Sequence, residues 1–227
     1  MFRIALACFT LVSAITAQAD LLDQVSQTDM TTGLKDSLQQ GAVSAIAKLG
    51  QENGFFNNAK VKIPLPKPMQ QAEKLMRTFG MKKQADELVL SMNRAAEAAV
   101  PEAKELFVGA VQAMSVQDAY GILKGGEDSA TQYFRKNTED PLRTRFLPIV
   151  IKAIEKVGLA QQYNAVASKA AKLGLIKGND TNVEDHVTQK ALDGLYVMMA
   201  EEEKAIRANP VKAGTDIAKK IFDLLRK

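Results

Sequence analysis

Three polar side chains that could do chemistry interrupt an alanine-rich stretch at residues 93–100. Asn93 and Glu97 are four residues apart, and Arg94 and Glu97 are three apart, so all three can meet on one face of a helix. If that helix is central, Glu97 is at least partly buried and needs a partner, because an unpaired buried charge is strongly destabilising. Two interpretations stay open: an internal salt bridge with hydrogen bonds between helices, or a ligand-binding carboxylate.

A second polar position lies in a later apolar segment, where Asp193 precedes Gly194. Glycine inside a helix costs ~1 kcal/mol relative to alanine, so either close packing or a nearby ligand is expected to require it. Asp193 is therefore a fourth candidate ligand-binding residue, beside Asn93, Arg94 and Glu97. Further along, residues 201–203 are all glutamate and are followed by Lys204 and Arg207, a pattern that predicts a solvated, ion-paired face with Glu203 and Arg207 in the favourable i,i+4 order.

Several catalytic and metal-binding classes find no support in the residue pattern. The glycines of residues 121–126 have the spacing of a phosphate loop, but Glu127 and Asp128 stand where such a loop needs Lys and Ser or Thr. His186 is the only histidine and Cys8 the only cysteine, and no serine-nucleophile signature occurs. We therefore predict no catalytic residue, no metal and no cofactor. An enzymatic role is disfavoured but left open, because two carboxylates suffice for some hydrolases.

The amino terminus has the three-part pattern of a secretory signal. A basic start, residues 1–3, is followed by an uncharged run at residues 4–16 and by Ala17-Gln18-Ala19, which has the small–x–small form of a cleavage site. We expect cleavage after Ala19 and a periplasmic or secreted mature protein of residues 20–227. With 30 basic and 26 acidic residues, the net charge of +4 is too small to indicate nucleic-acid binding.

The remaining pattern predicts one all-α domain of about eight or nine helices, with a single extended, proline-rich arm. Hydrophobic residues recur at helical spacing, and aromatic residues make up only 6% of the chain. Pro64, Pro66 and Pro68 favour an extended arm that lies across helices. We expect Pro101 to kink a long helix and Pro141 to begin a new one. The expected helices are residues 31–51, 69–79, 82–114, 115–124, 127–136, 141–157, 159–173, 181–208 and 215–225.

Two basic segments are candidate interaction surfaces. Residues 60–83 hold seven basic residues and one acid, Glu73, although a solvated face is the favoured interpretation of such a run. The expected helix at residues 215–225 is basic and amphipathic, and it can either dock on the protein's own core or make peripheral contact with an anionic membrane. No segment after the signal approaches eighteen apolar residues, so no transmembrane segment is expected in the mature chain. The pattern identifies no partner.

Taken in order, six motifs resemble the bacterial exported family catalogued as domain of unknown function 4197. The resemblance runs from about Leu34 to the C-terminus and implies an exported helical protein. One departure is His186, where members of the family more often carry tyrosine. The six motifs are Ile63-Pro64-Leu65-Pro66, Asn93-Arg94-Ala95-Ala96-Glu97, Asp118-Ala119-Tyr120-Gly121-Ile122-Leu123-Lys124-Gly125-Gly126, Ala130-Thr131-Gln132-Tyr133-Phe134, Lys190-Ala191-Leu192-Asp193-Gly194-Leu195-Tyr196 and Glu201-Glu202-Glu203-Lys204-Ala205-Ile206-Arg207-Ala208-Asn209-Pro210.

The family has no assigned reaction, so the resemblance carries no catalytic role onto any residue. We expect a binding or structural protein of the cell envelope. The alternative is an enzyme, or a carrier of small apolar molecules, that uses Asn93, Arg94 and Glu97.

Overall fold

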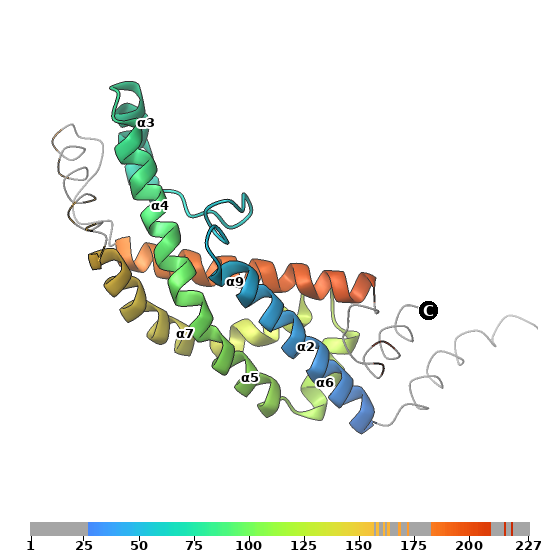
Figure 1. Cartoon of the computed structure of the whole chain (residues 1–227). Helices are drawn as coiled ribbons and strands as arrows, with labels where there is room; N and C mark the ends of the chain where they lie inside the picture. Colours follow the sequence, from blue (N-terminus) through green and yellow to red (C-terminus); the bar gives the residue numbers. More distant parts are fainter. Residues whose placement is uncertain are drawn as a thin grey trace, which may run out of the picture.

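The computed structural model describes residues 27–156 and 183–209, with isolated positions at 158, 161, 163, 168, 172, 216 and 219. All regular elements in this part of the chain are helices, which confirms the expected all-α class (Figure 1). The elements are α2 (Gln27–Gly50), α3 (Lys67–Thr78), α4 (Lys82–Ala99), the 3₁₀ helix η1 (Val100–Glu102), α5 (Ala103–Ala113), α6 (Val116–Lys124), α7 (Ser129–Lys156) and α9 (Val183–Ala208).

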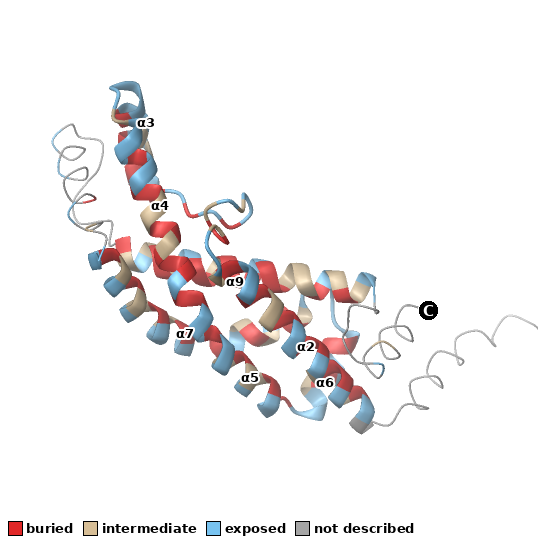
Figure 2. Ribbon diagram, in the orientation of Figure 1, coloured by how far each residue is buried: buried red, intermediate tan, exposed pale blue. Residues whose placement is uncertain are grey.

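Helix α9 lies at the centre of a single compact domain and packs against α2, α4 and α7. The face expected from its periodicity is the face that is buried, and it includes Val187, Ala191 and Leu195. Figure 2 shows the same division on the other helices, with buried residues on the sides that face one another. A ring cluster closes the core where Phe107 meets Phe134 edge-on, with ring centroids 5.2 Å apart. The apolar stripes predicted from the sequence therefore form one continuous core.

Helix α7 corrects the prediction that a new helix begins at Pro141. The helix continues unbroken through both Pro141 and Pro148, so two expected helices are one, and the described residues do not reach the expected eight or nine helices. Each internal proline removes a helix hydrogen bond and costs ~3 kcal/mol in a free helix. Both prolines are exposed, while Leu142 and Phe146 extend the buried face in phase. Burial of that face outweighs the lost backbone hydrogen bonds.

Two local predictions are confirmed. Pro101 interrupts the long helix, which becomes α4, η1 and α5. Ser115 begins α6 with a reciprocal cap, since its Oγ accepts from the Asp118 backbone N–H at 3.1 Å and the Asp118 carboxylate accepts from the Ser115 backbone N–H at 3.0 Å. Hydrogen bonds from the Ser115 side chain and backbone lower the pKa of Asp118.

Between α2 and α3 runs the longest non-helical segment of the described residues, residues 51–66, which we call the arm. It begins with tight turns and continues as an extended strip, and the extended part confirms the prediction made from the prolines. Its apolar side chains, Phe55, Ile63 and Leu65, are fully buried although they belong to no helix. The arm is therefore part of the core.

Three sequence predictions fall on other parts of the chain. The signal peptide of residues 1–19 and the expected helix at residues 159–173 lie outside the described residues, apart from single positions in the latter. The expected C-terminal helix at residues 215–225 is likewise described at only two positions. Among the helices that are described, none combines the length and the apolar character needed to cross a bilayer.

Candidate functional site

The carboxylate of Glu97 is buried against the arm. Only 4% of the residue is exposed, and it lies in the last turn of α4. Its Oε1 accepts hydrogen bonds from two consecutive backbone N–H groups, those of Phe55 at 3.0 Å and Phe56 at 3.2 Å. These amides belong to a turn and have no helix or sheet to satisfy them, so the carboxylate supplies their acceptor.

Arg94 completes the pairing that the sequence predicted. Its Nη1 donates to Glu97 Oε2 at 2.5 Å, which is a short, charge-assisted hydrogen bond. Its Nη2 reaches past the carboxylate to the start of the arm, where it donates to Glu52 Oε1 at 3.0 Å and to Asn53 Oδ1 at 2.9 Å. Asn53 has a left-handed backbone, with φ of 68°, a conformation that asparagine tolerates better than most residues. Arg94 thus joins the buried glutamate to the turn that begins the arm.

Asn93 holds the extended end of the arm and is fully buried. Its Oδ1 accepts from the Ile63 backbone N–H at 2.8 Å, and its Nδ2 donates to the Ile63 carbonyl oxygen at 2.9 Å and to the Val89 carbonyl oxygen at 2.7 Å. The side-chain amide therefore gives Ile63 both hydrogen bonds that a neighbouring β-strand would provide. Asn93, Arg94 and Glu97 form one cluster, as expected, and its partners are the protein's own arm.

Helix α9 also packs against the arm. A Cβ atom on Gly194 would lie 2.7 Å from Phe55 Cε1 and 3.2 Å from Val61 Cβ, so close packing with the arm requires the glycine. Asp193 does not join the cluster. It accepts from Gln189 Nε2 at 3.0 Å and pairs with Lys190 Nζ at 3.0 Å, both on its own helix.

Polar contacts with α9 extend along the arm. His186 Nε2 donates to the Pro64 carbonyl oxygen at 2.9 Å, and burial lowers the pKa of this histidine below its ordinary value. Lys60 forms an ion pair with Glu201. The arm is thus clamped between α4 and α9 along most of its length.

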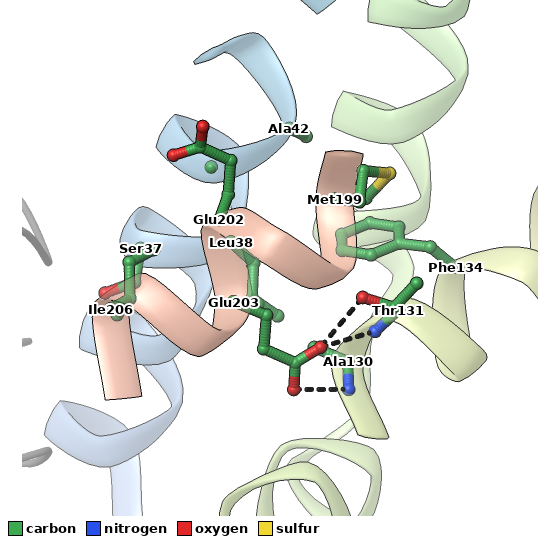
Figure 3. A pocket seen from close by; sticks show the side chains of 11 residues that line it. Ser37, Leu38, Ala42, Ala130, Thr131, Phe134, Met199, Glu202, Glu203 and Ile206 are labelled. Atoms are coloured by element: carbon green, nitrogen blue, oxygen red, sulfur yellow. Dashed lines mark hydrogen bonds between the residues drawn. The ribbon is translucent and has the colours of Figure 1, made fainter. Parts of the chain in front are cut away.

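Sequence reasoning missed the burial of Glu203, which was expected on a solvated face. The residue is 6% exposed. Its Oε1 accepts from the Ala130 backbone N–H at 3.0 Å, and its Oε2 accepts from the Thr131 backbone N–H at 2.9 Å and from Thr131 Oγ1 at 2.8 Å (Figure 3). These amides belong to the first turn of α7, so Glu203 caps a helix from a distance of more than seventy residues along the chain.

The predicted pair of Glu203 with Arg207 is confirmed. Arg207 donates to Glu203 Oε1 through Nε at 3.1 Å and Nη2 at 2.9 Å. Its Nη2 also donates to the Ile122 carbonyl oxygen and to Ser129 Oγ, each at 2.8 Å. The i,i+4 spacing identified the pair, but nothing in the local sequence indicated that it would be covered by α6 and α7.

The hollows in the described part of the chain are small or open. Glu203 borders a cavity of about 20 Å³, room for a single water molecule, together with Leu38 and Met199 (Figure 3). An open groove of about 580 Å³ runs between α7 and α9, where Arg135 lies over the Tyr196 ring at 4.5 Å. The Tyr196 hydroxyl is hydrogen-bonded to Thr138 Oγ1 at 2.9 Å, and burial raises the pKa of Tyr196 to about 12.

The clusters therefore fasten segments of the chain to one another. No set of three or more His, Cys, Asp or Glu side chains that could hold a metal ion occurs within the part of the chain that the structure describes. Each buried carboxylate already accepts hydrogen bonds from backbone amides and from an arginine. A general acid or base must instead reach a substrate proton.

Comparison with known proteins is consistent with the sequence resemblance. No curated protein and no solved structure matches the chain. A family model described as protein of unknown function, DUF4197, matches residues 24–223, and the chain therefore belongs to that family.

Proposed function

We propose that the protein is exported to the cell envelope and works there as a binding or structural protein. This proposal rests on one observation: the buried polar side chains are hydrogen-bonded to the protein's own backbone. Glu97 and Asn93 hold the arm, and Glu203 holds the start of α7, so the side chains best suited to chemistry are engaged by the protein's own backbone. What remains for an external partner is the outer surface of the helical domain.

The alternative function uses Asn93, Arg94 and Glu97 as a site for a substrate or a small apolar ligand. It requires the arm to leave α4, because the arm's backbone occupies both Glu97 Oε1 and the Asn93 amide. Departure of the arm would also expose the fully buried Phe55 and Ile63. Exposing two such side chains costs about 3–6 kcal/mol, which is a large part of the stability of an ordinary domain. The binding or structural role needs no such opening.

Export is tested by sequencing the amino terminus of the protein isolated from a periplasmic fraction. The expected first residue is Asp20, because Ala17-Gln18-Ala19 precedes it in the pattern of a cleavage site. An intact Met1 on protein recovered only from the cytoplasm would contradict the proposed location.

The mode of action is tested by native mass spectrometry of the protein purified from its own compartment. A complex with another macromolecule, or the protein alone, agrees with a binding or structural role. A small-molecule adduct that is lost in Glu97→Gln but kept in Glu52→Gln would overturn it in favour of the ligand-carrier alternative. Glu52 is a fitting control because it contacts the same Arg94 from a side chain that is 79% exposed.

A further inference from the structure

The α3–α4 hairpin projects from the rest of the domain (Figure 1). Helix α3 packs chiefly on α4, and α4 in turn packs on α7 and α9. At the tip the chain reverses within a tight turn, where the Phe79 backbone N–H donates to the Leu75 carbonyl oxygen at 2.9 Å and the Met81 N–H donates to the Met76 carbonyl oxygen at 2.8 Å. Gly80 supplies the positive φ of 79° that this turn needs. The tip is therefore a defined structure.

An aromatic side chain stands at the outermost point of this hairpin. Phe79 is 73% exposed, whereas the next most exposed large hydrophobic side chain among the described residues, Tyr120, is 47% exposed. Leu75 lies one helical turn before Phe79 and is also exposed. Met76, between them in the sequence, is buried and belongs to the hydrophobic core. The turn thus exposes the Phe79 side chain, which takes little part in the packing of the hairpin.

Positive charge surrounds this apolar point. Residues 74–83 contain four basic residues and no acid. Arg77 forms ion pairs with Glu73 at 2.8 Å and with Asp86 at 2.7 Å. The other three, the tip lysines, are Lys74, Lys82 and Lys83, all exposed.

Only one of the tip lysines is paired in the structure. Lys83 lies 3.9 Å from Glu87, and its side chain is 89% exposed. The acids of the hairpin, Glu73, Asp86 and Glu87, lie on either side of residues 74–83 in the sequence, and two of them share an open groove with Lys82 and Lys83. The excess of positive charge is therefore confined to the turn around Phe79.

We propose that the tip of the α3–α4 hairpin binds the surface of an anionic phospholipid bilayer. Phe79 enters the interface between headgroups and acyl chains, and the tip lysines contact lipid phosphates. A bilayer suits this tip because a fluid interface yields to a projecting ring, whereas a folded protein partner would need a matching cavity. The inference deepens and rests on the proposed function, which places the protein in the envelope beside such lipids.

A single-tryptophan variant tests the contact directly, because the chain contains no tryptophan. The full mature protein carrying Phe79→Trp is mixed with vesicles of phosphatidylglycerol and phosphatidylcholine. We expect its emission to shift to shorter wavelength and to be quenched by lipids with brominated acyl chains. Tyr120→Trp on α6 is the matched control, since Tyr120 is also exposed and also lies near a lysine, Lys124 Nζ, 4.4 Å from its ring centroid. Its emission should not change.

The charge requirement is tested by sedimentation with the same vesicles. We expect the double substitution Lys82→Glu and Lys83→Glu to weaken binding roughly tenfold or more. The pair Lys104→Glu and Lys136→Glu, at exposed positions on α5 and α7, should bind as the unmodified protein does. All the replaced side chains are exposed, and thermal unfolding monitored by circular dichroism shows whether each variant is folded.

Two outcomes would overturn the inference. One is a folded protein that does not sediment with anionic vesicles. The other is a protein that sediments while the Phe79→Trp emission stays unchanged, which would place the contact elsewhere, as in the basic C-terminal segment. Failure here is distinct from failure of the proposed function. If the mature protein begins at Asp20 but does not bind vesicles, only the hairpin contact is contradicted. If the protein isolated from cells retains Met1, while the Phe79→Trp emission of the 20–227 protein shifts on vesicles, the contact is supported and export is contradicted.

Discussion

Two glutamates, Glu97 on α4 and Glu203 on α9, are buried, and the charge of each is stabilised by the same kinds of partner. Each accepts hydrogen bonds from two consecutive backbone N–H groups far away in the sequence. Each is paired with an arginine on its own helix, Arg94 three residues before and Arg207 four residues after. Each arginine then extends to the segment that the glutamate holds. A buried charge is tolerated at both places because the carboxylate oxygens accept hydrogen bonds from backbone amides and from an arginine.

The two glutamates differ in the segment of the chain that each one binds. Glu203 caps the first turn of α7, where the N–H groups lack helical acceptors and the helix dipole favours a negative charge. Glu97 holds the turn at the start of the arm, which has no helix dipole and little regular hydrogen bonding of its own. Glu203 also accepts five hydrogen bonds and Glu97 three. We infer that Glu203 stabilises the domain as a whole, and that Glu97 stabilises chiefly the arm.

The largest expected effect is that of Glu203→Ala. The substitution leaves two amides of α7 without an acceptor and removes the carboxylate partner of Arg207, which keeps only the Ile122 carbonyl oxygen and Ser129 Oγ. We therefore expect the free energy of unfolding to fall by about 4 kcal/mol. Chemical denaturation measures it. Glu127→Ala is the control, because Glu127 is 76% exposed, lies near the same helix end and forms only a surface ion pair with Lys204. It should change stability by less than about 1 kcal/mol. Equal effects of the two substitutions would contradict the role of Glu203 as a buried cap.

Glu97→Ala is expected to lower the free energy of unfolding by about 3 kcal/mol, somewhat less than Glu203→Ala, because fewer hydrogen bonds are lost. The sharper readout is local. Amide hydrogen exchange of Phe55 and Phe56 should accelerate more than exchange of the α7 amides, since these two donate to Glu97. Glu52→Ala is the exposed control. An unchanged melting temperature in Glu97→Ala would remove the distinction between the two clusters and place Glu97 at the surface.

Gly194→Ala tests the other wall that holds the arm. The new methyl group would meet the Phe55 ring at 2.7 Å, so the arm must shift, and we expect a net loss of about 1–2 kcal/mol despite the better helix propensity of alanine. Gly109→Ala in α5 is the control, since its Cβ would meet nothing within 4 Å. That variant should be stabilised by up to about 1 kcal/mol. A Gly194→Ala protein as stable as Gly109→Ala would mean that the arm is loosely held at this point.

The smallest expected effect concerns pH and the contact of His186 with Pro64. Burial lowers the pKa of His186 and the nearby Lys190 lowers it further, while the Pro64 carbonyl and Asp193 oppose the change. Because the pKa is lower in the folded state, the unfolded chain takes up the proton first as the pH falls below about 6.5. The stabilisation is thus present above that pH and is lost below it.

This contribution is measured as the change in melting temperature between pH ~8 and pH ~5.5, compared in the unmodified protein and in His186→Gln. The variant should show a shallower dependence on pH, because glutamine does not titrate in this range. Parallel curves for the two proteins would contradict a pKa of His186 lowered by burial.

The sequence by itself determined the local features of this protein. It predicted the all-α class, the buried face of α9, the reciprocal cap at Ser115 and the interruption at Pro101. It also predicted that Asn93, Arg94 and Glu97 share one helix face. Each of these depends on residues no more than a few positions apart, so spacing alone carries the information.

Only the tertiary structure decided which polar residues are buried and what they hold. Glu203 belongs to a run of three glutamates that looks like any solvated face, and its burial depends on α7, some seventy residues away. Pro141 has the pattern of a helix start, but α7 passes through it because the buried face continues on both sides, at Thr138 and at Leu142. Contacts of this kind join distant segments, and their energies exceed local preferences of a few kcal/mol, so a local pattern cannot contain them.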